Sequence, residues 1–88
     1  MTLAYTTRQD GAKTQAFADH RGYRIEVATG WDINSDSWRA HLYLTSAAGV
    51  RTKIDSWAGG EFASGEDAID EGLRVGEYHV NGLKSQQA

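Results

Sequence analysis

Strict alternation of apolar and polar residues is the feature of this sequence that most constrains its fold. Between Trp38 and Leu44 every second residue is apolar, and the positions between them hold Arg39, His41 and Tyr43. Side chains of a strand point alternately to its two faces, so this run predicts a strand over residues 37–46 with one apolar and one polar face. The chain therefore has to form a sheet that buries one side.

Two further runs alternate in the same way. Residues 22–30 alternate around Tyr23, Ile25 and Val27, and residues 50–57 alternate around Thr52 and Ile54. The link at 32–37 is rich in Asp, Asn and Ser, and Ala-Ala-Gly forms the link at 47–49. Such residues favour tight turns, because Asp, Asn and Ser side chains bond to their own backbone and glycine bends freely. The order predicts three antiparallel strands joined by two hairpins.

The segment after the third predicted strand carries the signals of a helix. Ser64 followed three residues later by Asp67 is typical of a helix N-terminus. Apolar residues then recur at helical spacing, among them Ile69, Leu73 and Val80, which predicts a helix over residues 65–80 with one stripe against the sheet. The pair at 81–82, Asn-Gly, is a suitable stop.

These elements predict an α+β fold, a three-stranded antiparallel sheet packed on one face by a C-terminal helix (β-β-β-α). A chain of 88 residues has room for one core, and we assign the single domain to residues 20–83. Residues 1–19 show no sustained period and are predicted to be an irregular or flexible N-terminal arm, and residues 84–88 a disordered tail. The covered face is expected to carry Tyr23, Ile25, Trp38, Leu42, Leu44 and Ile54.

Composition narrows the class of protein. The chain has no cysteine, so disulfides, thiolate chemistry and sulfur-based zinc sites are excluded. No apolar run approaches the roughly 18 residues of a membrane span, and residues 1–10 lack the features of an export signal. We therefore expect a cytoplasmic protein that does not bind a membrane. The net charge of −3 gives no overall attraction to nucleic acid, so only a local patch could bind it.

Two segments match binding motifs only in part, and each lacks residues that the motif needs. Asp32, Asn34 and Asp36 have the spacing of calcium-loop ligands, but Ser37 stands where the loop needs glycine and Tyr43 where it needs glutamate. The glycines at 60 and 65 imitate a phosphate loop, but acidic residues follow them and would repel a phosphate. With no nucleophile motif either, the sequence predicts a non-catalytic protein without metal or cofactor.

A pair of glycines inside the predicted helix needs a physical reason. Gly72 and Gly76 each cost about 1 kcal/mol in helix propensity against alanine. Acidic residues surround the pair, so a membrane helix contact is excluded. We expect instead a close approach of the helix to the sheet, beneath Trp38 or Phe62.

The sheet face opposite the helix is the most informative surface. Alternation places there a candidate interaction set of cations and rings: Arg24, Arg39, His41, Tyr43, Arg51, Lys53 and Trp57. Three interpretations stay open. The set is a polar face balanced by cross-strand ion pairs, a protein interface, or a surface for single-stranded nucleic acid, in which rings stack bases and cations hold phosphates.

We favour a non-catalytic interaction domain that meets another protein, or a second copy of itself in a homodimer, through this face. Single-stranded nucleic acid is the alternative ligand. A chain this short buries few apolar side chains, so covering the second face of the sheet would add to its stability.

Three motifs resemble those of a known group of proteins. Residues 21–27 read R-G-Y-x-I-x-V, residues 38–40 read W-x-A, and residues 62–72 read F-x-S-x-E-x-A-I-x-x-G. Together they resemble a set of small proteobacterial single-domain proteins of unknown function, over about residues 20–82. The resemblance implies a bacterial protein with the β-β-β-α fold and assigns no activity. The helix entry F-x-S-x-E-D-A-I is also similar to that of HicB-type antitoxin domains, whose separate DNA-binding segment has no counterpart here.

Overall fold

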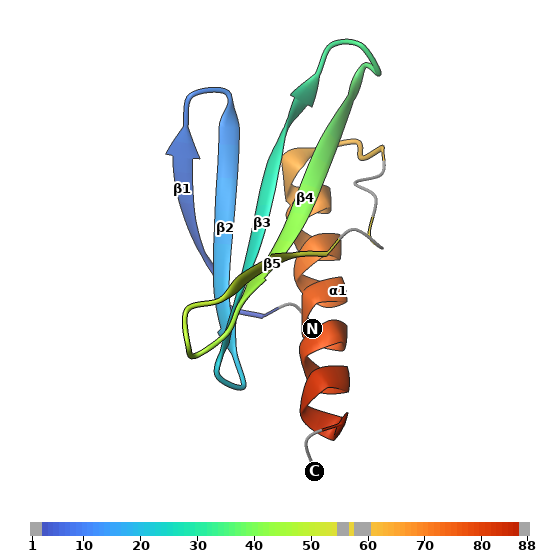
Figure 1. Ribbon diagram of the computed structural model, residues 1–88. Helices are drawn as coiled ribbons and strands as arrows, with labels where there is room; N and C mark the ends of the chain where they lie inside the picture. Colours follow the sequence, from blue (N-terminus) through green and yellow to red (C-terminus); the bar gives the residue numbers. More distant parts are fainter. Residues whose placement is uncertain (1–2, 55–56, 58–60, 87–88) are drawn as a thin grey trace.

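Five strands and one helix make up the part of the chain that the computed structural model describes, which is residues 3–54, 57 and 61–86. They are β1 (Thr6–Asp10), β2 (Lys13–His20), β3 (Tyr23–Asp32), β4 (Ser37–Thr45), β5 (Arg51–Lys53) and α1 (Gly65–Gln86). The strands lie in the order β1-β2-β3-β4-β5, each antiparallel to its neighbour, and α1 packs against the sheet (Figure 1). The predicted class, an α+β domain with a C-terminal helix on an antiparallel sheet, is confirmed.

The prediction of an irregular N-terminal arm was wrong, and with it the count of three strands. Residues 6–10 and 13–20 form the hairpin β1–β2, which turns at Gly11 with a φ of 63°. Strand β2 alternates like the others, but its buried positions are Ala16 and Ala18, which are 0% and 4% exposed. Alanine adds little apolar area, so this period is faint in the sequence. Strand β3, the first of the three predicted strands, is therefore paired on its other side with β2.

The predicted apolar face is buried beneath the helix. In the β3–β4 ladder Val27 lies opposite Leu42 and Ile25 opposite Leu44, which places all four side chains on one side of the sheet. All four are buried, and the half-buried rings of the residues at 23, 57 and 62 pack at the margin. Helix α1 covers β3 and β4, touches β2 less, and makes no contact with β1. The core is therefore centred on the middle of the sheet.

Two glycines bring α1 close to β3. A Cβ on Gly72 would lie 2.7 Å from Cγ2 of Val27, and one on Gly76 would lie 2.5 Å from Cγ2 of Ile25. Real Cβ atoms do not approach other carbons this closely, so the two positions accept only glycine at this helix–sheet distance. The close approach was predicted, but its place beneath Trp38 or Phe62 was wrong.

The helix begins as predicted and ends later. The Asp67 N–H donates to Ser64 Oγ at 3.1 Å, which confirms the N-cap. The expected stop at 81–82 was wrong, and α1 continues to Gln86. Asn81 does not end the helix because its Oδ1 is held from the β2–β3 turn, 2.8 Å from His20 Nε2 and 3.2 Å from Arg21 Nη1.

The predicted tail also needs correction. Residues 84–86, expected to be disordered, belong to α1, while residues 87–88 lie outside the described part of the chain. The third predicted strand is shorter than expected, since β5 holds only the residues Arg51–Lys53 of the range 50–57. No helix in the described ranges is long and apolar enough to cross a membrane.

Candidate functional site

The open face is the side of the sheet that points away from α1. In the β4–β5 ladder Lys53 lies opposite Tyr43, and in the β3–β4 ladder Arg24 lies opposite Thr45. Residues on these positions alternate with the buried ones, so they share the uncovered side. Six of the seven predicted interaction residues lie there: Arg24, Arg39, His41, Tyr43, Arg51 and Lys53.

The seventh, Trp57, was placed on the wrong face. Its ring lies on the helix side, where its Cη2 would be 3.1 Å from a Cβ on Gly72, and its centroid is 6.0 Å from that of Phe62. The β4–β5 ladder ends at Lys53, so the alternation that put Trp57 on the open face does not extend to it. Trp57 is a core residue at the margin of the sheet. Asp55, which the alternation of residues 50–57 also predicts for the open face, lies outside the described residues.

The hairpin β1–β2 enlarges the open face with residues that the sequence reasoning missed. In the register of this hairpin Arg8 lies opposite Gln15. Phe17 lies opposite Glu26, which in turn lies opposite Tyr43, so the three side chains form one row across the open face. The alternation of Ala16 and Ala18 was the signal that could have located them. Six of the chain's nine Lys and Arg residues lie on this face: Arg8, Lys13, Arg24, Arg39, Arg51 and Lys53.

A buried carboxylate lies at the centre of the open face. The Glu26 side chain is only 10% exposed, and it accepts hydrogen bonds from Arg51 Nη2 at 2.9 Å and Gln15 Nε2 at 3.4 Å. The bond to Glu26 raises the pKa of the Arg51 guanidinium above its ordinary value. The same guanidinium lies 3.8 Å from the centroid of the Tyr43 ring. Arg51 is therefore fixed between a ring and a carboxylate.

Two more arginines of the open face are paired. Arg24 Nε lies 3.3 Å from Asp19 Oδ1, and Arg39 Nη1 lies 3.8 Å from Asp32 Oδ2. The first pair is largely exposed and the second is long and partly exposed, so each contributes little to stability. They lower the net positive charge of the face, as the interpretation of a balanced polar surface predicts.

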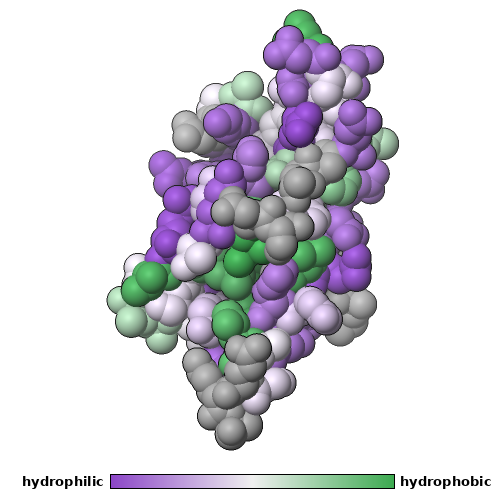
Figure 2. Space-filling model, turned by 45° about the vertical axis from the view of Figure 1, so that its right-hand side comes forward, coloured by the Kyte–Doolittle hydropathy of each residue, from purple (hydrophilic) through white to green (hydrophobic). Residues whose placement is uncertain are grey.

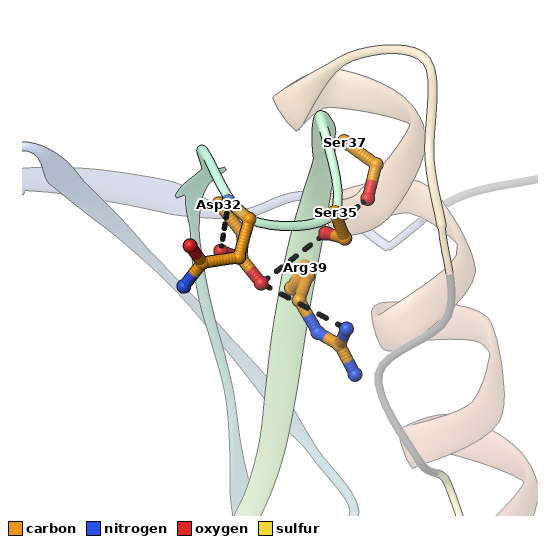
Figure 3. A network of polar contacts seen from close by, with 5 residues as sticks. Asp32, Ser35, Ser37 and Arg39 are labelled. Carbon is orange, nitrogen blue, oxygen red and sulfur yellow. Dashed lines mark hydrogen bonds and ion pairs between the residues drawn. The ribbon is translucent and has the colours of Figure 1, made fainter.

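The Asp32 carboxylate makes its hydrogen bonds within the β3–β4 turn. Its carboxylate accepts hydrogen bonds from the Asn34 N–H at 3.0 Å and from Ser35 Oγ at 3.2 Å, and Ser35 Oγ lies 2.8 Å from Ser37 Oγ (Figure 3). The Asp32 carboxylate thus serves to close the turn, as expected of a hairpin link rather than a calcium loop. In the described part of the chain, no group of three His, Asp or Glu side chains could hold a metal ion.

A second cluster of cations surrounds His41. Burial lowers the pKa of His41 below its ordinary value of 6.5, and the positive charges of Lys53, Lys13 and Arg39 lower it further. None of the ion pairs found among the described side chains includes either lysine. This end of the open face therefore holds positive charge near an imidazole that is mostly neutral at pH 7, an arrangement that favours the approach of an anion.

No family model, curated protein or solved structure matches this chain. The resemblance to small proteobacterial proteins therefore stays a prediction that its three motifs carry. The open face is the candidate site, because it gathers cations and aromatic rings on a surface that α1 leaves uncovered.

Proposed function

We propose that this protein is a small non-catalytic interaction domain whose open face binds the acidic surface of another protein. One observation carries the proposal. Six of nine cations lie on the uncovered side of the sheet, around the half-buried rings of Phe17 and Tyr43, in a chain whose net charge is −3. Rings flanked by arginine are typical of interface hot spots. The same face carries the carboxylates of Asp19, Glu26 and Asp32, so its cations are in excess but not alone, and this excess favours a partner of negative charge.

The size of the open face fits a modest interface. Five strands spaced about 4.8 Å apart, with roughly seven residues each at about 3.3 Å per residue, give an area of about 500 to 600 Å². Specific complexes bury about 800 Å² on each partner, and transient ones bury less. A partner that covers this face would therefore bind reversibly.

Charge makes a second copy a poorer partner for the open face than an acidic protein. A two-fold homodimer presents the same patch to itself, so the excess positive charge of one copy would approach that of the other. The acidic surface of the chain is the start of α1, which carries Glu66, Asp67, Asp70 and Glu71. A contact between that helix and the open face of another copy would be head-to-tail and would not close into a dimer.

Affinity capture from the cells that make the protein tests the proposal with three baits. The first is the unchanged chain, the second carries Lys13→Glu with Lys53→Glu, and the third carries Arg21→Glu with Arg74→Glu. The last two change the net charge equally, but only the second alters the open face. We expect an acidic protein that the first and third baits retain and the second loses, because reversed charge on the open face repels it. Identical protein sets on all three baits would contradict the proposal.

Single-stranded nucleic acid is the second candidate ligand, and the cluster around His41 is the observation that favours it. Lys13 and Lys53 are free of ion pairs with the described side chains, and the Tyr43 ring lies on the same strand two residues from His41. Phosphates would contact the lysines, and a base would stack near the ring. Arg51 already lies over one face of that ring, so only part of it is open to a base.

Fluorescence anisotropy with a labelled oligonucleotide of about 16 nucleotides tests this candidate. If it binds, affinity must fall steeply between about 50 mM and about 200 mM salt, since phosphate contacts release counterions. Affinity must also rise as pH falls below 6.5, because the His41 pKa is lowered in the free protein and a phosphate favours the charged imidazole. His41→Gln removes this pH dependence. Absence of binding at low salt excludes the candidate.

A further inference from the structure

Strand β5 presents an edge whose backbone groups are directed away from the sheet. Its neighbour is β4, and the Ile54 N–H donates to the Leu42 carbonyl while the Ser46 N–H donates to the Val50 carbonyl, both at 2.9 Å. Hydrogen-bonded pairs alternate with non-bonded pairs along an antiparallel ladder. The backbone groups of residues 50, 52 and 54 therefore face β4, and those of Arg51 and Lys53 point outward.

An apolar groove lies beside this edge, on the helix side of the sheet. It has a volume of about 430 Å³ and lies between β5 and the C-terminal half of α1, with Tyr23, Leu44, Val50, Ile54, His79 and Leu83 among its lining residues. Val50 is 62% exposed and Leu83 38% exposed. Figure 2 looks toward this side and shows hydrophobic surface near the middle of the molecule. The groove thus leaves apolar side chains in contact with water next to a sheet edge that no described strand pairs with.

The two sides of β5 differ in chemistry. Arg51 and Lys53 point their side chains to the open face, while Val50, Thr52 and Ile54 point theirs toward the groove. A strand added at this edge would alternate in the same way. Its residues that pair with Arg51 and Lys53 would meet cations, and the residues between them would meet the groove.

We propose that β5 and the groove form a peptide-binding site that takes an extended segment of a partner protein as a sixth strand, with acidic and apolar residues in alternation. The acidic residues lie opposite Arg51 and Lys53 in the new ladder, where Lys53 meets their charge while Arg51 keeps its bond to Glu26, and the apolar ones cover Val50 and Leu83. This site shares Arg51 and Lys53 with the open face, but its backbone groups and its groove lie outside that face, so the proposal does not depend on an acidic partner binding there. It adds main-chain hydrogen bonds as the source of affinity.

A second copy of the chain fits this edge less well. Two β5 strands paired antiparallel would bring Arg51 and Lys53 of one copy opposite those of the other, and like charges directly opposite are destabilising. Lysine and arginine on an edge strand oppose self-association in this way. The same cations attract an acidic strand, so charge selects the occupant.

The test uses the peptide Glu-Val-Glu-Val-Glu-Val-Glu, acetylated and amidated, with the full-length protein. Backbone amide exchange followed by NMR is expected to slow at Arg51 and Lys53 when the peptide is added. N-methylation of the peptide tests whether main-chain hydrogen bonds hold it. The glutamates lie opposite Arg51 and Lys53 in hydrogen-bonded pairs, whereas the N–H groups of the valines point away from β5. Methylating the glutamate nitrogens should weaken binding at least about tenfold, and methylating the valine nitrogens by no more than about twofold.

A pair of protein variants adds a control. Val50→Asp places a carboxylate in the groove mouth and is expected to weaken peptide binding at least about tenfold. Ile33→Asp introduces the same group at an exposed position of the β3–β4 turn, where the residue is 82% exposed, and should leave binding unchanged.

Three results would overturn the proposal. They are no binding at millimolar peptide, equal binding of the two methylated peptides, and slowed exchange at amides other than Arg51 and Lys53. A fourth, slowed exchange at those two amides in concentrated protein without peptide, together with a dimer in sedimentation, would assign the edge to a second copy instead. Loss of the open-face partner in the capture experiment leaves these outcomes unchanged, so the two proposals fail separately.

Discussion

Replacing Gly76 with valine is expected to destabilise the protein by about 3 kcal/mol or more, a large part of the stability of a domain this small. A Cβ at this position would lie 2.5 Å from Ile25 Cγ2 and 3.3 Å from Leu42 Cδ1, both in fully buried side chains. Neither side chain has room to move, so α1 has to shift away from β3 and open the core. Urea unfolding followed by circular dichroism measures the loss.

Gly82 provides the matched control for this prediction. It lies in the same helix, and a Cβ there would meet nothing within 4 Å. Gly82→Val should therefore change stability by less than about 1 kcal/mol, the difference in helix propensity alone. If Gly76→Val cost no more than about 1 kcal/mol, the close approach of α1 to β3 would be refuted.

Replacing Leu42 with alanine is expected to cost about 2 to 5 kcal/mol of unfolding free energy. Leu42 is 0% exposed, lies opposite Val27 in the sheet and reaches the glycine side of α1. Ladders on both sides hold β4, so the backbone is not free to collapse into the cavity left by the missing atoms. Thermal and urea unfolding of the variant check the value.

The neighbouring residue gives the contrast. His41 lies on the same strand with its side chain on the open face, and His41→Ala should change stability by no more than about 0.5 kcal/mol. If Leu42→Ala and His41→Ala lowered the unfolding free energy equally, β4 would not have one buried and one solvent-exposed face. The face assignment of every residue in the candidate site would then be in error.

The strands that sequence reasoning located are those whose buried positions hold large side chains. Ile25, Val27, Leu42 and Leu44 make the period of β3 and β4 easy to see, and Ser64 marks the helix start. Strand β2 was missed because alanines fill its buried positions. The late end of α1 could not be read from Asn81 and Gly82, since the contact that holds Asn81 comes from a turn about 60 residues earlier.

The candidate site was predictable only in part for a similar reason. Alternation along β3 and β4 placed Arg39, His41 and Tyr43 on the open face. The burial of Glu26 depends on its neighbours across two ladders, Phe17 from β2 and Arg51 beside Tyr43, and no local pattern reports such neighbours. Trp57 was misplaced because a period of two has meaning only while the chain stays in the sheet.

Because α1 contacts only part of the sheet, the strands differ in local stability. The helix does not contact β1, so the outer hairpin is joined to the rest mainly through the ladder between β2 and β3. Elements with few packed neighbours open at a lower free energy than the core. Arg8 and Lys13 belong to this hairpin, and a molecule that binds them must also immobilise it. A ligand bound to the basic surface should therefore reduce the motion of the N-terminal hairpin before it affects α1.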